Sequence, residues 1–459
     1  MSSKAITIPG PQTGASGRYK VFPVEHPSLP ILRRNAADLA GISDDYDGSV
    51  DGYFKLTAEE KKAHDSFLVH LVEKNRDVLS ENRDIHYAAG NLVNGHNLIL
   101  DQGLNNVMTS YAWCNGFTSC AAGTGTTPTF TDSGAVTATA AGTTVTSSGS
   151  FFNSGMTGML LNFDGGAGSR YITFVDATHA TLSSALTVGS PTLFTVYAVN
   201  QTGLDTEVKR NSTYLTGAGN CGTSFTSTSQ AMQRTYDFSI EVANINYSEL
   251  GWSNSGSAGN NLFSRSLISG GTVSVLIGQA LRVVYALTIT VSSASTPGTY
   301  SITGWPVAPS VNTDGDYSLG NPFGNTGASP LGTVSTSGGS SVTSGAGYEI
   351  SGQGGVPIGN WMKLCTGTTL PVFGNDYSVG TSVNFDSAST GSYSSGTFQR
   401  DYSFHMNVGT GNRTDFRGIV FQLATTCFVF VFDQDQTKDN LHTLDVNITI
   451  RINRVLTNP

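Results

Sequence analysis

The sequence predicts a mainly β protein with two related β-sandwich-like domains, a small β insertion in the first domain, an extended N-terminal arm and one N-terminal helix. Three observations predict this fold. Charged residues make up only 12% of the 459 residues, whereas Gly is abundant, with 54 residues. Because long helices favour Ala, Leu, Glu, Lys and Arg, this composition disfavours many long helices. Short runs of Thr, Val, Tyr and Phe are interrupted by Gly, Ser and Asn, which is typical of strands and turns. Parts of the sequence also recur.

Three segments recur in the same order. They are residues 120–132 and 365–376, residues 233–238 and 399–404, and residues 287–291 and 446–450. The middle pair is the clearest, because Gln-Arg-Thr-Tyr-Asp-Phe in the first copy corresponds to Gln-Arg-Asp-Tyr-Ser-Phe in the second. Three matches in one order predict an internal duplication of one β-domain.

The spacing of these segments indicates an insertion. The first segments start 245 positions apart and the middle segments 166 positions apart, so the first copy has 79 additional residues between them. We assign most of this excess to residues 142–197, where short strands are expected at 143–146, 159–163, 171–175 and 180–182. Strands spaced by roughly 10 residues are typical of a small barrel or sandwich.

Residues 1–55 are expected to form an extended arm. Each proline fixes φ and removes a backbone donor, and this segment contains Pro9, Pro11, Pro23, Pro27 and Pro30. An arm without a core of its own cannot offset the entropy lost when it becomes ordered. We therefore expect it to be held by contacts outside its own β-domains, and to anchor the protein.

An amphipathic helix is predicted within residues 56–90. Thr57 is a suitable N-cap, and Glu60 occupies the capping-box position three residues later. Phe67, Leu71 and Val78 belong to one apolar stripe and are the residues to which we assign self-association. Two interpretations of the stripe remain open: the helix packs against its own β-domain, or it packs against copies of itself or a docking partner.

The rest of the chain divides by composition. The first β-domain is expected at residues 91–141 and 198–295, with residues 142–197 as the inserted module. Residues 296–348 are rich in Gly, Ser, Thr and Pro, which indicates a linker. The second β-domain is expected at residues 349–459.

The sequence contains no catalytic constellation that stands out, so we predict no enzymatic activity, no cofactor and no catalytic, cofactor-binding or metal-binding residues. It has no nucleotide-binding fingerprint and no nucleophile elbow. The odd number of cysteines, without a C-x-x-C pair, argues against a zinc site or a disulfide framework; they are Cys114, Cys120, Cys221, Cys365 and Cys427. Acidic groups at 44–51, 314–316 and 433–439 suit solvated turns, with calcium binding as the alternative.

Arg234 and Tyr236 recur as Arg400 and Tyr402. Residues two apart on a strand share one face, so each pair is expected to point to the same side. The structural interpretation is that the arginines pair across the sheet while the aromatic rings fill the core; ligand binding is the alternative.

The net charge of −9 is spread without a basic cluster, which disfavours nucleic-acid binding. No run of about 20 apolar residues occurs, so we expect no membrane insertion. We also expect no signal peptide, because the N-terminus opens onto polar, proline-containing sequence.

Several segments resemble the β-rich tail-fibre and baseplate- or collar-associated structural proteins of tailed bacteriophages. The resemblance covers about residues 95–295 and rests on residues 97–104, 123–128, 234–236, 249–253 and 261–268, with Cys120 between the first two. Residues 151–152 and 171–174 of the insertion are similar to small β-modules of phage tail proteins. The resemblance implies a mechanical role in the virion and brings no catalytic residues. The second copy keeps only residues 417–419 of the 249–253 segment.

We therefore expect a non-enzymatic virion component in the tail, collar or fibre apparatus, made in the host cytoplasm. It would anchor through its N-terminal region and assemble through its β-domains as a homo-oligomer, with three subunits. Its other partners would be virion structural proteins and a host surface glycan or receptor. A capsid-decorating or head-fibre protein is one alternative, and a carbohydrate-binding or carbohydrate-cleaving tailspike is another.

Overall fold

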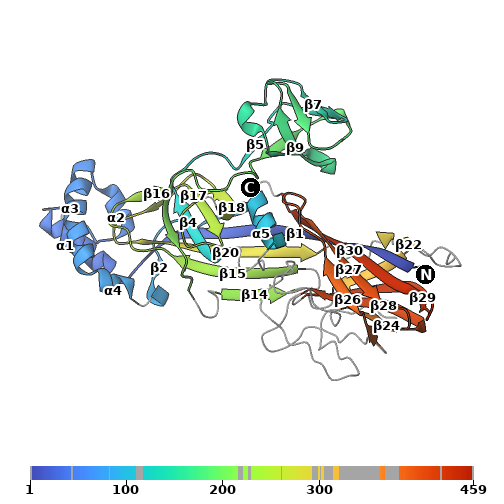
Figure 1. Ribbon diagram of the computed structural model, residues 1–459. Coiled ribbons are helices and arrows are strands. Elements are labelled where there is room, and N and C mark those ends of the chain that lie inside the picture. The colour runs from blue at the N-terminus through green and yellow to red at the C-terminus, as the bar shows by residue number, and fades with distance from the viewer. Residues whose placement is uncertain are drawn as a thin grey trace.

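The computed structural model describes residues 3–42, 45–81, 83–109, 117–215, 221–225, 229–259, 261–291, 298–299, 301–303, 314–319, 362–366, 382–423 and 426–456. The protein is mainly β, which confirms the predicted fold class. Figure 1 shows an elongated molecule with a group of helices at one end, two regions of sheet, and a small β-module above the main body. Most of the predicted linker, residues 296–348, lies outside the described residues, as do residues 349–361.

Strand β1, Ser3–Glu25, runs along the middle of this architecture (Figure 1). One edge pairs in parallel with β30 (Thr443–Arg454) from Ser3 to Ala15, and then antiparallel with β3 (Val93–Ile99). The other edge pairs antiparallel with β20 (Ala280–Val291) from Thr13 to Val24. Residues 3–25 are extended, as predicted, but they do not form a separate arm, because their backbone groups pair with strands of both predicted β-domains.

The strands around β1 form a 14-stranded sheet in the described part of the chain. Its main path is β13-β4-β17-β18-β3-β1-β20-β15-β14. The strands not yet given are β13 (Glu207–Asn211), β4 (Ser119–Gly123), β17 (Glu249–Ser253), β18 (Leu262–Leu267), β15 (Ser229–Asp237) and β14 (Cys221–Phe225). Attached beside this path are β30 and four further strands, β2 (Tyr87–Ala88), β22 (Ser301–Thr303), β26 (Ser387–Thr390) and β27 (Gln399–Met406).

Two smaller sheets complete the body. A six-stranded sheet has the order β21 (Gly298–Thr299), β23 (Asp314–Leu319), β29 (Thr426–Lys438), β28 (Arg413–Leu423), β24 (Met362–Cys365) and β25 (Ser382–Asn384). A two-stranded sheet joins β16 (Ile245–Tyr247) to β19 (Val273–Val275). Helix α5 (Asp101–Thr109) follows β3 and contacts β18.

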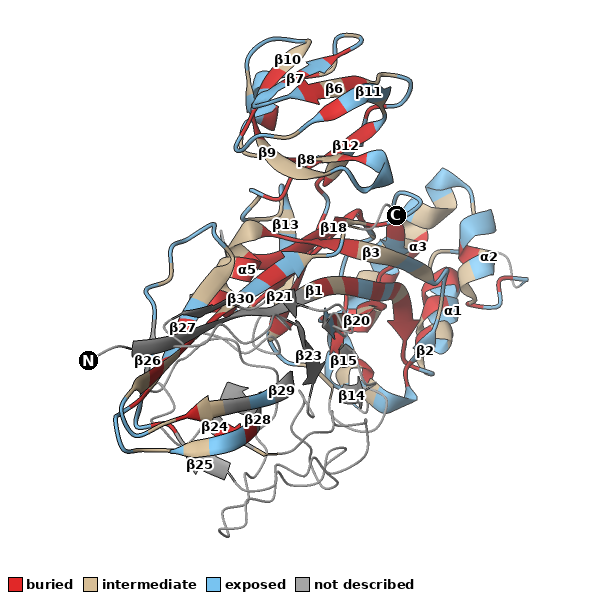
Figure 2. Ribbon diagram, turned by 90° about the vertical axis from the view of Figure 1, so that its right-hand side faces the viewer, coloured by how far each residue is buried: buried red, intermediate tan, exposed pale blue. Residues whose placement is uncertain are grey.

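Large aromatic side chains fill the core of the first domain. The rings of Trp252 and Tyr285 are stacked with centroids 4.2 Å apart, and Phe117 meets Tyr285 edge-on. Tyr19 of β1 packs beside Trp252. The same continuous core extends to Tyr402 of the second domain. Figure 2 shows buried residues following the strands from one domain into the other. The two predicted domains therefore share a core.

The inserted module has its own sheet and its own core. The sheet order is β11 (Val188–Thr192), β6 (Ala138–Ala141), β7 (Thr144–Ser147), β10 (His179–Leu182), β9 (Gly168–Phe174), β8 (Leu160–Phe163), β12 (Phe194–Tyr197) and β5 (Phe130–Asp132), with 3₁₀ turns η3 (Ser154–Met156) and η4 (Asp164–Gly166). Its core includes Phe163 and Phe194, which are 0% and 1% exposed. The module ends near Tyr197, as predicted, but begins at Phe130 rather than at residue 142, because β5 and β6 complete its sheet.

Residues 26–86 form a helical end. It consists of α1 (Leu29–Leu39), α2 (Val50–Lys55), α3 (Ala58–Lys74), α4 (Arg76–Ser80) and the 3₁₀ turn η1 (Arg83–Ile85). Helices α1 and α2 replace the second half of the predicted arm. The capping box of α3 is confirmed: the Thr57 hydroxyl accepts from the Glu60 backbone N–H at 3.3 Å, and the Glu60 carboxylate accepts from the Thr57 backbone N–H at 2.8 Å.

The helical end is inserted at the tip of a strand pair. Glu25, the last residue of β1, pairs with Tyr87 of β2, and Val24 pairs with Ala88. All four helices therefore lie between two residues that are already hydrogen-bonded neighbours in an antiparallel ladder. They close over the end of the sheet, where Leu68, Val72 and Leu79 pack with Ile240 and Ile277.

The pairing of the two recurring regions agrees in part with a duplication. Cys120 of β4 lies opposite Trp252 of β17, and Cys365 of β24 lies opposite Gly418 of β28. The 166 residues between Trp252 and Gly418 equal the interval between the two Gln-Arg segments. The local strand orders β14-β15-β20-β1 and β26-β27-β30-β1 also correspond.

The third recurring segment does not keep this register. Leu287 pairs four residues before Tyr236 on β15, whereas Val446 pairs two residues after Tyr402 on β27. The third pair of segments is therefore six residues out of register, so its sequence match does not reflect equivalent positions. The duplication remains a prediction that rests on the first two segments.

The position of β1 predicts opposite results for two deletions. Replacing residues 26–86 with Asn-Gly, a two-residue sequence suited to a tight hairpin, should leave a soluble protein with its β signal in circular dichroism. Ile240→Thr and Ile277→Thr would be added to mask the sheet end that the helices cover. Deleting residues 3–25 should abolish soluble, folded protein, because β20, β3 and β30 all lose their common partner. Retention of soluble β structure after the second deletion would contradict the central role of β1.

Candidate functional site: the exposed surface of the helical end

The structure divides the predicted self-association stripe. Phe67 is 37% exposed and Val78 is 50% exposed, whereas Leu71 is half-buried against the core of the helical end. Their neighbours Leu68 and Val72 are buried. The helix packs on its own chain, as the first of the two interpretations states, but part of its stripe remains on the surface. Self-association through Phe67, Leu71 and Val78 remains a prediction.

Exposed apolar side chains concentrate at this end of the molecule. Of the fifteen large apolar residues that are exposed in the described part of the chain, eight lie between residues 31 and 92. They are Ile31, Leu39, Phe54, Phe67, Val78, Ile85, Tyr87 and Leu92. Contiguous exposed apolar surface on a soluble protein commonly marks an interaction site, whereas scattered single residues need no explanation. This concentration makes the helical end the strongest candidate for docking.

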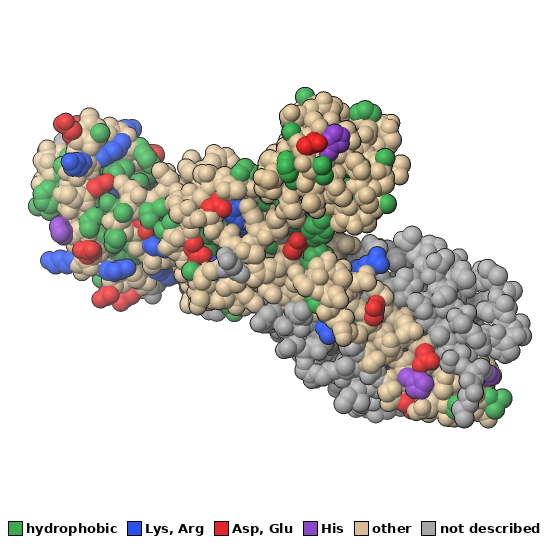
Figure 3. Space-filling model, turned by 45° about the horizontal axis from the view of Figure 1, so that its top comes forward, with side chains coloured by type: hydrophobic (Ala, Val, Ile, Leu, Met, Phe, Trp, Pro, Cys, Tyr) green, Lys and Arg blue, Asp and Glu red, His purple; other side chains and the backbone are tan. Residues whose placement is uncertain are grey.

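Charged residues are also enriched here. Residues 29–86 contain 20 of the 57 charged residues of the chain, of both signs. Figure 3 shows these charges interspersed with apolar side chains over the helical end, while uncharged polar surface predominates over the adjoining body. Apolar contacts inside a polar, charged rim are the usual anatomy of a protein–protein interface.

The sequence analysis missed Ile31, Leu39 and Phe54 because it assigned their segment to an arm. The available signal was the helical spacing of Leu29, Leu32, Arg33 and Ala36.

A buried carboxylate fixes the helical end to the sheet. Glu25 accepts hydrogen bonds from Arg33 of α1 at 2.7 Å, from the Tyr87 hydroxyl at 2.6 Å and from the Gln279 amide at 3.0 Å. The Arg33 and Glu25 side chains are 0% and 4% exposed. The hydrogen bonds from Tyr87 and Gln279 satisfy further acceptor sites of the buried carboxylate and so offset part of its desolvation cost, whereas Nε of Arg33 has no hydrogen-bond partner in the described structure. These contacts of Glu25 fix α1 to the sheet, so the exposed surface of the helical end has a rigid support.

A second polar contact joins α2 and α3 to the body. The Tyr53 hydroxyl donates to the Asp65 carboxylate at 2.9 Å, and the Asn244 amide donates to that same carboxylate at 2.8 Å. Burial, followed by the hydrogen bond to Asp65, raises the pKa of Tyr53 above its usual range, so the phenol stays protonated as a donor. His64, fully buried, bridges the Arg33 carbonyl and Asp65.

His86 lies where the helical end rejoins the sheet. Its side chain is buried, and neither ring nitrogen has a hydrogen-bond partner in the described structure. Burial, followed by the positive charge of Arg83, lowers the pKa of His86 to about 4. The imidazole is therefore neutral in the folded protein over the pH range in which an exposed histidine would become protonated.

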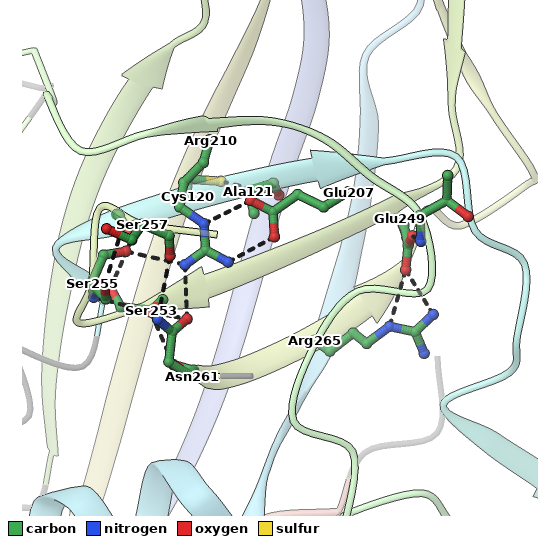
Figure 4. Close-up of polar contacts among 12 residues, drawn as sticks. Cys120, Ala121, Glu207, Arg210, Glu249, Ser253, Ser255, Ser257, Asn261 and Arg265 are labelled. Atoms are coloured by element: carbon green, nitrogen blue, oxygen red, sulfur yellow. Dashed lines mark hydrogen bonds and ion pairs between the residues drawn. The ribbon is translucent and has the colours of Figure 1, made fainter. Parts of the chain in front are cut away.

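Buried charged groups are often catalytic, and the candidate here is the ion pair between β17 and β18 (Figure 4). Arg265 donates to the Glu249 carboxylate from Nη2 at 2.7 Å and from Nε at 3.1 Å, and both side chains are fully buried. The second Glu249 oxygen accepts from the backbone N–H groups of Gly125 and Thr206 at 2.9 and 2.8 Å. Every acceptor position faces a protein donor, so this carboxylate is structural.

The position of Glu249 explains what it stabilises. Gly125 lies where the chain leaves the main sheet for the inserted module, and Asp205 and Thr206 lie where it returns. Asp205 contributes a backbone donor to Glu249 and a carboxylate to Arg265, at 3.1 and 2.9 Å. The adjacent Arg210–Glu207 pair on β13, joined to Asn261, extends this network in Figure 4. One carboxylate thus ties both connections of the module to the sheet.

The repeated arginines have structural contacts. The Arg234 guanidinium stacks over Phe117 and Tyr214 and donates to the Phe117 carbonyl. Arg400 donates to the Met108 carbonyl at the end of α5. The tyrosines and phenylalanines two and four residues later on both strands are buried in the core. The aromatic part of the prediction is confirmed, but the described hydrogen bonds of the arginines run to the backbone carbonyls of Phe117 and Met108 and not across the sheet.

The remaining predicted features are the cysteines and the acidic groups. The Cys120 thiol is buried and free, and burial raises its pKa, which makes it a weak nucleophile. Asp47 accepts from the Ser49 backbone in an exposed turn. The side chains of Asp44, Asp314, Asp316 and Asp433, and of the other four cysteines, lie outside the described part. No group of three His, Cys, Asp or Glu among the described residues could hold a metal ion.

No protein-family model, curated protein or solved structure matches this chain. No helix in the described ranges is long and apolar enough to cross a membrane.

Glu249→Gln should destabilise the protein by about 3–5 kcal/mol, because the buried guanidinium of Arg265 loses its buried carboxylate partner and an amide N–H group is placed among donors that the carboxylate accepted from. The matched control is Asp415→Asn, since the Asp415–Arg413 pair is exposed and such pairs contribute roughly 0–1 kcal/mol. Urea unfolding followed by tryptophan fluorescence would measure both, with Trp252 on the same strand as Glu249. Equal losses in the two variants would contradict the structural role given to Glu249.

His86 should make the helical end less stable as the pH falls from about 6.5 to 4. In that interval the unfolded state binds a proton that the folded state does not, so the free energy of unfolding decreases towards low pH. Compared with His86→Leu, the wild type should lose about 2–3 kcal/mol more between pH 7 and pH 4. Urea unfolding followed at the helical circular-dichroism band measures this difference.

The control for this measurement is His70→Leu, at an exposed position of α3, which should keep the pH dependence of the wild type. Identical pH profiles for the wild type and His86→Leu would show that His86 stays accessible to protons.

Proposed function

We propose that this protein is a non-enzymatic structural component of a phage virion, in its tail, collar or fibre apparatus, and that it attaches through the helical end. The observation that carries the attachment is the concentration of exposed apolar side chains on a unit fixed to the sheet by buried Glu25 and Arg33. A rigid base lowers the entropy that is lost when such a surface binds a partner. The virion assignment is supported by the resemblance of residues 95–295 to phage tail proteins.

The mode of attachment proposed here differs from a free arm. The N-terminal strand is part of the sheet, so the contact with neighbouring virion proteins falls to α1–α4. Self-association into a homo-oligomer, with three subunits, would use Phe67, Leu71 and Val78 of the same surface. A capsid-decorating or head-fibre location would use this surface equally, and only the position on the particle distinguishes it from the tail.

The carbohydrate-cleaving tailspike is the weaker alternative. Glycosidases of most families place two carboxylates about 5–10 Å apart across the bond that they cleave. The buried carboxylates of the described residues, Glu25, Asp237, Glu241 and Glu249, are engaged by arginine, lysine, tyrosine or backbone donors. This engagement favours a mechanical role over a catalytic one.

Antibody labelling of intact, purified particles of the virus that encodes the protein tests the virion assignment. Labelling at the tail, collar or fibres is the expected result. Labelling on the capsid would support the decorating alternative, and absence of the protein from purified particles would overturn the proposal.

The triple variant Phe54→Ser, Phe67→Ser and Val78→Ser should fold normally, because all three side chains are exposed, and should fail to enter particles or to form the oligomer. A matched control, Val175→Ser with Leu441→Ser, changes exposed apolar residues elsewhere and should behave as the wild type. Light scattering measures the subunit number, and immunoblotting of particles measures incorporation. Normal incorporation and assembly of the triple variant would refute attachment through the helical end.

A further inference from the structure

A cleft lies where the inserted module meets the main sheet. Its volume is about 300 Å³, and its walls come from several separated segments of the chain. The module side contributes Thr129, Phe130 and Tyr197. The sheet contributes His96 and Leu98 of β3, together with residues 266–270, which include the end of β18 and the loop after it. Small-molecule sites favour such concave positions between two structural units, and this volume is at the lower end of their usual range. It suits one ring-sized group.

One wall of the cleft is aromatic and apolar. The rings of Phe130 and Tyr197 lie with centroids 6.2 Å apart and planes inclined by 37°. Tyr197 and Leu98 are 3% and 9% exposed and belong to the apolar cluster between the module and the sheet. The wall is therefore apolar and formed by two inclined rings, of which Phe130 is the more exposed.

The opposite wall is polar, and much of it is already satisfied. The Tyr19 hydroxyl donates to the Leu267 carbonyl at 2.9 Å and accepts from the Ser269 backbone N–H at 3.0 Å. The Ser266 hydroxyl donates to the His96 carbonyl at 2.8 Å. These bonds hold the 266–270 segment in place without help from a ligand, so the polar wall is preformed.

Three polar side chains of the lining form no such hydrogen bond. The hydroxyls of Thr129 and Ser269 and the imidazole of His96 form no side-chain hydrogen bond with another described residue. Nδ1 of His96 is shielded from solvent and lacks a hydrogen-bond partner there. The other ring nitrogen, Nε2, is not shielded in this way, so it is the atom of His96 that a hydroxyl group in the cleft would contact.

The lining also limits the charge of a ligand. No described lining residue is Asp, Glu, Lys or Arg. An ion that entered would lose hydration without gaining a partner of opposite charge. A purely apolar ligand would leave the imidazole and the two hydroxyls without partners. The ligand that fits is neutral, has the size of one ring, and carries an apolar face with hydroxyl groups around its edge.

We propose that this cleft binds a neutral sugar ring, either a free monosaccharide or one residue of a glycan, with its apolar face on Phe130 and Tyr197 and its hydroxyls towards His96, Thr129 and Ser269. The site binds without cleaving, since its described lining has no carboxylate. The inference goes beyond the attachment role and does not depend on it, because the cleft and the helical end are formed by different residues.

Saturation-transfer NMR on the purified full chain tests the site, with D-glucose, D-galactose, D-mannose and N-acetyl-D-glucosamine as probes. At least one should bind with a dissociation constant on the order of 1 mM. Glucose 6-phosphate, the charged comparator, and cyclohexanol, the comparator with one hydroxyl, should bind more weakly. Failure of all four sugars to bind, or equal binding of cyclohexanol, would overturn the proposal.

Two variants locate the binding. His96→Ala should weaken it about fivefold to tenfold, which corresponds to the loss of one hydrogen bond. Ser269→Trp adds bulk at the exposed rim and should abolish it while preserving the Ser269 backbone bond to Tyr19. Ser184→Trp, on an exposed loop of the module, is the matched control and should bind as the wild type. Unchanged binding in folded Ser269→Trp protein, checked by circular dichroism, would place the sugar elsewhere and refute the site.

Discussion

The pairing of β1 on both edges is the constraint on which the rest of the structure depends. Its first half lies between β30 and β22, and its second half lies between β3 and β20. Because a strand's N–H and C=O groups point to both sides, an unpaired β1 would leave two open edges in the middle of the protein. The same strand joins two domains far apart in sequence and carries the helical end at its tip.

Two buried glutamates attach the inserted units in the same way. Glu25 ends the outgoing strand of the helical end and accepts from Tyr87 on the returning strand. Glu249 accepts from Gly125 on the outgoing connection of the β-module and from Thr206 on the returning one. Each carboxylate is also paired with a buried arginine. An insertion held at both of its chain connections is fixed in orientation without a large interface, which suits surfaces that must face outward.

Much of the fold could be predicted from local patterns. The alternation around Tyr236 and Tyr402, the short strands of the module and the capping box at Thr57 are properties of neighbouring residues, and all appear in the structure. The role of residues 3–25 could not be predicted in this way. Its prolines and glycines resemble an arm, and the strands that pair with it lie more than 60 residues away or at the far end of the chain. The loop-closure entropy of such pairings is offset only in the complete sheet.

The same reasoning explains why the sites were only partly visible in the sequence. Phe67 and Val78 follow a helical period, so a surface on that helix could be proposed, but its extent depended on how α1 and α2 fold back beside it. The cleft is harder still, since β3, the connections of the module and the loop after β18 contribute separate residues, none within a recognisable motif. His96 and Ser269 are 173 positions apart in the sequence. They share a site only because Ser266 bonds to the backbone of His96 and Tyr19 holds the following loop. Where long-range strand pairing holds a fold together, the register of the strands decides which side chains meet in a site. Register is the property that the local sequence specifies least.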